Sequence, residues 1–146
     1  MSENYRLTGK DVDRLLEFSK EPGFPCRLAR EVAELYCKGG MIKSPCVQTY
    51  GIFEGDRLVS VMTATYAFVF PHEDSPGGRI CHISGTFTSD EFRHKGYATA
   101  LLKSIERDAR GWNADYLCCD SSADGFDKNS GFIGAPENES RLWKPL

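Results

Sequence analysis

After Thr88 the hydrophobic period of the chain changes from strand-like to helical, and this change constrains the fold more than any other feature. Three segments before it are rich in β-branched and aromatic residues and indicate strands joined by turns, at Val47–Phe53, Leu58–Phe70 and Arg79–Thr88. The segment after it, SDEFRHKGYATALLKSIERDARG, places apolar residues on one face of a helix, namely Tyr97, Leu101, Leu102, Ile105 and Ala109. A strand meander followed by an amphipathic helix predicts a sheet with a helix packed on it.

Shorter segments complete the predicted order of elements. Thr8 followed by Asp11 resembles a capping box that opens a helix, and a second helix ends at Gly39 and Gly40. The remaining expectations are a short strand at Tyr5–Leu7, a strand at Tyr116–Cys119, one short helix after it, and edge strands around Phe132 and Trp143. The order predicts an α/β (α+β mixed) sheet, mostly antiparallel and flanked by helices, in a single domain over residues 1–146.

Length and charge exclude several classes of protein. The 146 residues suit one core, and 18 basic against 21 acidic residues give a net charge of −3, so we expect no nucleic-acid partner. The longest nearly uncharged stretch, Leu58 to Pro71, is shorter than the roughly 20 residues of a bilayer span, so we expect no membrane association. The opening MSENYRLTGKD lacks the layout of a signal peptide, which predicts a cytoplasmic protein.

Six cysteines raise the question of disulfides or a metal site. No two of them have the CxxC spacing that holds one ion between adjacent turns, and we predict no metal. Cysteine is among the most buried residue types, so we interpret these thiols as reduced, apolar filler of the core. The six are Cys26, Cys37, Cys46, Cys81, Cys118 and Cys119.

The segment RHKGYA, at residues 93–98, lies where the last meander strand gives way to the amphipathic helix. Backbone N–H groups in the first turn of a helix lack internal partners and bind phosphate readily. Gly96 would let a phosphate approach closely, Ala98 keeps the next position small, and Arg93 and Lys95 add positive charge. The alternative is an ordinary helix start that happens to contain a glycine and basic residues.

In this context RHKGYA, of the form RxxGxA, resembles the turn of the GNAT acetyltransferase superfamily. The resemblance implies the GNAT fold with a splayed strand pair, and acetyl-CoA as co-substrate. It assigns the pantetheine arm to Thr86, Phe87 and Thr88, and the pyrophosphate to the turn made by Arg93, His94, Lys95, Gly96, Tyr97, Ala98 and Thr99. A proline often found three residues before the arginine is Asp90 in this chain.

The resemblance also implies an enzyme, an N-acetyltransferase that acts by direct attack of a primary amine in a ternary complex. Our first candidate for the general base is His82, because a histidine collects a proton at neutral pH; a histidine hydrogen-bonded within the sheet is the alternative. With a period of two, His82 shares a face with Ser84, Thr86 and Thr88. Tyr66 is a weaker candidate, as are Glu73 and Asp74.

The proton donor to the thiolate is the point where the sequence departs from the family. The pattern AxxxY followed by GF would begin at Ala123, and Asp127 then occupies the place of the tyrosine. A carboxylate of ordinary pKa cannot donate a proton at neutral pH. Three readings stay open: another hydroxyl such as Ser130, Ser122 or Tyr66; water; or a non-catalytic acyl-CoA-binding sensor.

The acceptor is not identified by the sequence. The resemblance implies an acceptor site built from the loops at roughly Pro22 to Arg27, Pro71 to Gly78 and Gly134 to Arg141. Acidic residues in or beside these loops, such as Glu21, Glu73 and Glu139, would suit a cationic amine, although solvated loop charges have the same pattern. A homodimer is also left open. A dinucleotide-binding fold is disfavoured, because no GxGxxG follows the first strand.

Overall fold

The structure is a computed structural model that describes residues 4–120, 131–135 and 138–146. Its elements are a 3-10 turn η1 (Gly9–Asp11), α1 (Val12–Phe18), α2 (Arg30–Tyr36), β1 (Cys46–Glu54), β2 (Arg57–Phe68), β3 (Arg79–Thr88), a second 3-10 turn η2 (Asp90–Phe92), α3 (Tyr97–Gly111), β4 (Tyr116–Asp120), β5 (Ile133–Ala135) and β6 (Asn138–Pro145). The predicted meander and amphipathic helix are confirmed. The expected helix after Tyr116–Cys119 lies outside the described residues.

One six-stranded sheet organises these elements, in the order β1-β2-β3-β4-β6-β5. All of its pairs are antiparallel except β3 with β4, so the predicted mixed, mostly antiparallel sheet is confirmed. The segment predicted as a first strand instead contacts β1 through a single bridge between Arg6 and Tyr50. No helix among the described residues is long and apolar enough to cross a membrane.

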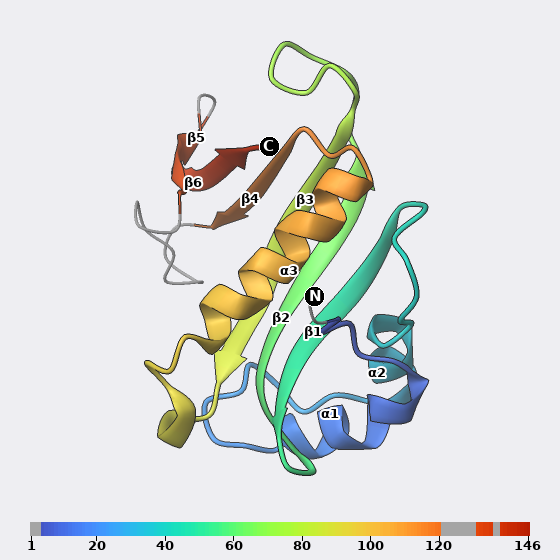
Figure 1. Cartoon of the computed structure of the whole chain (residues 1–146), viewed down its shortest axis with the longest axis vertical. Helices are drawn as coiled ribbons and strands as arrows, with labels where there is room; N and C mark the ends of the chain where they lie inside the picture. Colours follow the sequence, from blue (N-terminus) through green and yellow to red (C-terminus); the bar gives the residue numbers. More distant parts are fainter. Residues whose placement is uncertain (1–3, 121–130, 136–137) are drawn as a thin grey trace.

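Helices cover both faces of this sheet (Figure 1). The predicted apolar face of α3 packs on one face, where Leu101 and Ile105 contact residues of β1, β2 and β3. On the opposite face, Leu15 and Phe18 of α1 pack with Phe87 of β3. Figure 1 shows α1 and α2 near the turn between β1 and β2, at the end of the sheet opposite to the β2–β3 loop.

The first two helices follow the sequence prediction in part. The capping box is present, since Asp11 accepts a hydrogen bond from the Thr8 backbone and the Thr8 side chain accepts one from the first turn. In α2 the buried residue is Ala33, whereas Val32 and Leu35 are 42% and 49% exposed.

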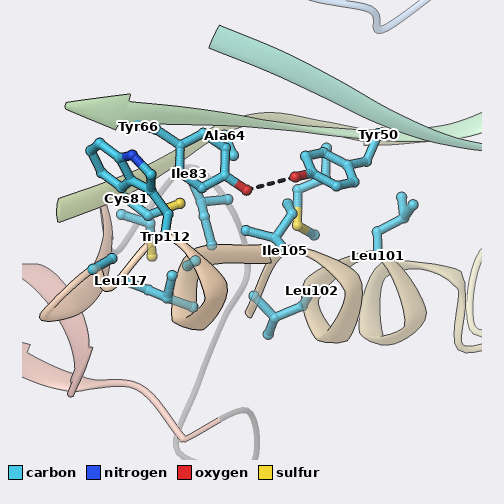
Figure 2. Close-up of a cluster of buried hydrophobic side chains, with 14 of the residues drawn as sticks. Tyr50, Ala64, Tyr66, Cys81, Ile83, Leu101, Leu102, Ile105, Trp112 and Leu117 are labelled. Atoms are coloured by element: carbon cyan, nitrogen blue, oxygen red, sulfur yellow. Dashed lines mark hydrogen bonds between the residues drawn. The ribbon is translucent and has the colours of Figure 1, made fainter. Parts of the chain in front are cut away.

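A chain of buried polar groups crosses the core between the sheet and α3 (Figure 2). The hydroxyls of Tyr50 and Tyr66 lie 2.6 Å apart, and the Tyr50 hydroxyl donates to Asp108 at 2.7 Å. Because Tyr50 has one proton and gives it to Asp108, Tyr66 is the donor to Tyr50. Asp108 also accepts from Arg6 at 2.7 Å, so the network fastens the N-terminal segment to α3.

Candidate functional site

The backbone takes a left-handed conformation just before α3 begins. Gly96 is the N-cap residue with a φ of 83°, and His94 has a φ of 62°. Among the described residues no side chain caps this helix, so the backbone N–H groups of its first turn are left to another partner. A Cβ built on Gly96 meets no heavy atom within 4 Å, which shows that the space in front of the turn is open.

A cleft of about 590 Å³ lies in front of this turn, and we call it the α3 cleft. It contains every residue that the sequence assigned to the cofactor except Lys95, and it adds Phe92. Its lining is Thr86, Phe87, Thr88, Phe92, Arg93, His94, Gly96, Tyr97, Ala98 and Thr99. The ammonium of Lys95 instead lies 5.4 Å from the centre of the Phe92 ring. The structure therefore brings the end of β3 and the start of α3 together around one space.

The edge of β3 in this cleft is open. β3 pairs with β4 only through Ile80, Cys81 and His82, and residues 83–88 have no strand partner on that side within the described part of the chain. The Thr86 hydroxyl oxygen is buried and has no hydrogen-bond partner among the residues that the structure describes. An extended ligand with amide groups can pair with such an edge as an added strand would.

A β-bulge interrupts β3 beside the open edge. Val61 of β2 pairs with Phe87 and Thr63 pairs with Ser84, so Met62 alone lies opposite both Gly85 and Thr86. Gly85 has a φ of 60°, as the extra residue of a bulge commonly requires. The expectation that His82, Ser84, Thr86 and Thr88 share one face is therefore wrong, because the bulge inverts the alternation after Ser84.

A second cavity, of about 320 Å³, lies on the α1 and α2 side of the sheet, and we call it the apolar pocket. It reaches the bulge at Gly85, and it contains hydroxyl, thiol and apolar side chains. Its lining is Leu15, Phe24, Pro25, Cys26, Leu28, Val32, Tyr36, Thr49, Val61, Thr63, Ser84 and Gly85. Gly85 lines this pocket and the next residue, Thr86, lines the α3 cleft, so the bulge lies between the two cavities.

Arg93 and Tyr97 are held in place at the rim of the α3 cleft. Arg93 donates to the Thr88 carbonyl at 3.2 Å and pairs with Asp90 at 3.1 Å. Tyr97 donates to Glu54, and this hydrogen bond raises the pKa of the Tyr97 hydroxyl. The hydrogen bonds to Thr88 and Glu54 fix the turn between β3 and α3 to strands β3 and β1.

The sequence of residues 12–132 matches the acetyltransferase (GNAT) family. The chain belongs to the GNAT acetyltransferase family. No curated protein matches the sequence.

Solved structures share the GNAT fold at low sequence identity. The GNAT domain of Streptomyces lividans PAT superimposes with a TM-score of 0.74 at 14% identity, covering 97% of this chain and 88% of that one. Arabidopsis thaliana NAA60 with a bisubstrate analogue gives 0.67 at 14% identity, covering 96% of both chains. A predicted acetyltransferase of Clostridium acetobutylicum, solved with acetyl-CoA, gives 0.66 at 17% identity, covering 90% of both.

Of the residues that the sequence assigned to catalysis in this GNAT chain, His82 and Tyr66 lie on opposite faces of the sheet. His82 is half-buried on the sheet face opposite α3, two residues before Ser84. Tyr66 is 1% exposed on the α3 face, its hydroxyl bonded to Tyr50, and burial raises the pKa of that hydroxyl far above its ordinary value. Tyr66 lines neither cavity. Asp127 lies outside the described residues, as do Ser122 and Ser130.

Sequence reasoning missed Phe92 and most of the apolar pocket, of which it named only the part from the loop Pro22 to Arg27. Phe92 lines the α3 cleft, and its ring stacks on Tyr97 with centroids 6.3 Å apart. Its position directly before the basic turn was the available signal. The pocket combines residues far apart in sequence, so no local motif marks it. Among the described residues no cluster of three or more metal-ligating side chains is present.

Proposed function

We propose that the protein transfers an acetyl group from acetyl-CoA to a primary amine. The observation that carries the proposal is the α3 cleft, in which the open edge of β3 and the uncapped first turn of α3 face the same space. In the reaction the amine nitrogen attacks the thioester carbon, an N–C bond forms and the C–S bond breaks. The bonding electrons leave with sulfur, and the amine loses one proton.

The start of α3 supplies the diphosphate site in this proposal. N–H groups of the first turn of α3 lack helical partners, and the helix dipole adds positive potential at this end. Gly96 allows a phosphate to approach, because no side chain fills the space and its φ of 83° suits glycine. Arg93 adds a positive charge at the rim.

The open edge of β3 supplies the site for the pantetheine arm. Thr86, Phe87 and Thr88 line the cleft beside the strand groups that β4 leaves unpaired. Two amides of an extended pantetheine chain can hydrogen-bond to this edge, and the unpartnered Thr86 hydroxyl is a further polar group there. The thioester then lies at the bulge, within reach of an amine in the apolar pocket.

We propose His82 as the general base. It lies on the same sheet face as Ser84, which lines the apolar pocket, and a spacing of two residues separates their Cα atoms by about 7 Å along the strand. His82 itself does not line the pocket, so in this proposal a water carries the proton from the amine to the imidazole. The thiolate takes its proton from solvent in this proposal, since Tyr66 is enclosed in the core.

We place the reaction in the cytoplasm. The six cysteines all lie in the described part of the chain, and none of them forms a disulfide. Cysteines at this density without disulfides are typical of a reducing compartment.

The experiment that tests the function follows release of CoA thiol when the purified protein is mixed with acetyl-CoA and a panel of primary amines. We expect amine-dependent release above the hydrolysis measured without amine. Calorimetric binding of acetyl-CoA with no release across a broad panel would instead establish the non-catalytic acyl-CoA sensor. Absence of both binding and release would remove the proposal altogether.

A further inference from the structure

The apolar pocket lies where an acceptor must enter, and its chemistry narrows the class of acceptor. Gly85 and Ser84 form the part of the pocket nearest the bulge, and the next residue, Thr86, lines the α3 cleft. An amine nitrogen that reaches the thioester at the bulge from the α1 and α2 side therefore leaves its substituent in this pocket. This step rests on the proposed function.

No charged group is present among the described residues of the lining, which contains no Asp, Glu, Lys, Arg or His. The Thr49 and Thr63 hydroxyls bond to each other at 2.8 Å, so each already has one partner without a ligand. A cationic side group transferred into this space would lose its water and gain no carboxylate, which is unfavourable. An apolar group would gain from leaving water.

Two of the acidic residues expected to serve a cationic acceptor, Glu21 and Glu73, are engaged or distant. Glu21 pairs with Arg57 at 2.6 Å and accepts a hydrogen bond from Ser89 at 2.7 Å, and it does not line the pocket. Glu73 is in the β2–β3 loop, which Figure 1 shows at the end of the sheet opposite to α1 and α2. Neither carboxylate is placed to receive a cation from the pocket.

We infer that the acceptor is a primary amine whose carbon next to nitrogen carries an uncharged, apolar group of about the size of a leucine or phenylalanine side chain. The pocket volume of about 320 Å³ lies at the low end of ligand cavities, which favours one compact group over a long chain. Phe24 and Leu28 from the α1–α2 loop, with Val32 from α2, supply its apolar wall.

The test compares amino-acid amides that share a reacting α-amine and differ in the side chain. We expect kcat/KM for leucinamide and phenylalaninamide, at saturating acetyl-CoA, to exceed that for argininamide and for glycinamide at least tenfold. Equal values, or a preference for argininamide, would overturn this inference and leave the acetyl transfer itself established.

A charge placed in the pocket tests the same inference from the protein side. Val32→Glu adds a carboxylate at a residue that lines the pocket and is 42% exposed, so the fold tolerates it. We expect the leucinamide to argininamide ratio to fall at least tenfold. Leu35→Glu is the matched control, on the same helix, 49% exposed and outside the lining, and it should leave the ratio unchanged. An unchanged ratio in Val32→Glu contradicts the inference.

Cys26 provides a readout that does not need turnover. It lines the pocket and is exposed, whereas Cys37, Cys81, Cys118 and Cys119 are buried. Phenylalaninamide added to the protein should slow alkylation of Cys26 by iodoacetamide, and argininamide should not. If no amide is acetylated, this protection still supports the pocket's selectivity while the proposed function fails. Equal alkylation with both amides would contradict the inference on its own.

Discussion

Gly85 and Thr86 are consecutive residues of β3, yet Gly85 lines the apolar pocket and Thr86 lines the α3 cleft. The bulge opposite Met62 produces this separation, because it gives the strand one residue more than its neighbour. In the proposed reaction the cofactor approaches from one side of this point and the amine from the other. Two sites of different chemistry therefore meet at one peptide unit.

The first prediction concerns the turn before α3. Gly96→Asp should weaken acetyl-CoA binding at least tenfold, which is about 1.4 kcal/mol, because a carboxylate would occupy the open space and repel a diphosphate. Isothermal titration calorimetry measures the affinity, and circular dichroism checks the fold. Gly111→Asp, at the far end of α3 where a Cβ also meets no neighbour, is the control and should bind normally. Equal affinity in both variants would refute the diphosphate site.

The α3 end of the molecule was predictable from the sequence because its signals are local. Helical spacing from Tyr97 to Ala109 gave α3, and Gly96 with its basic neighbours gave the turn. The same holds for the capping box at Thr8 and Asp11, in which each residue bonds to the backbone of the other. Interactions between residues three or four positions apart can be predicted from the sequence, because the spacing of the two residues identifies them.

The bulge and most of the apolar pocket were not predicted, for two physical reasons. Side chains alternate between the two faces of a strand, so a prediction of faces fails beyond a bulge, where one extra residue reverses the alternation. Gly85, between Ser84 and Thr86, was the local sign of this bulge. The pocket joins Phe24, Val32 and Thr63, whose proximity depends on how α1 and α2 pack on the sheet. Tertiary packing of this kind has no fixed spacing in the sequence.

The second prediction concerns His82. If its imidazole collects the proton of the amine, a side chain that cannot accept this proton should slow the reaction and leave cofactor binding intact. His82→Gln should therefore lower kcat about 10²-fold with unchanged affinity for acetyl-CoA. Thiol release at saturating substrates measures kcat, and calorimetry measures the affinity. His72→Gln, in the exposed β2–β3 loop, is the control and should leave kcat unchanged; a normal kcat in His82→Gln dismisses the base.

The third prediction separates structure from chemistry at Tyr66. Its hydroxyl donates to Tyr50 inside the core and lines neither cavity, so Tyr66→Phe should leave kcat and KM unchanged. The lost hydrogen bond should lower the free energy of unfolding by about 1 kcal/mol, while Tyr50 keeps its bond to Asp108. Urea unfolding measures the stability. A loss of kcat with normal acetyl-CoA binding would instead place the hydroxyl in the reaction.

The last prediction concerns thiol reactivity. The thiolate is the reactive form, and burial raises the pKa of Cys37 to about 12, so at pH 8 roughly one thiol in 10⁴ is ionised. Cys26 is exposed, and it should be alkylated by iodoacetamide in the native protein long before Cys37. Peptide mapping by mass spectrometry follows each site, and concentrated guanidinium chloride, which exposes all six thiols, is the control. Cys37 follows Tyr36, the last residue of α2, and packs in the core. Equal alkylation rates for Cys26 and Cys37 would therefore mean that α2 readily separates from the sheet.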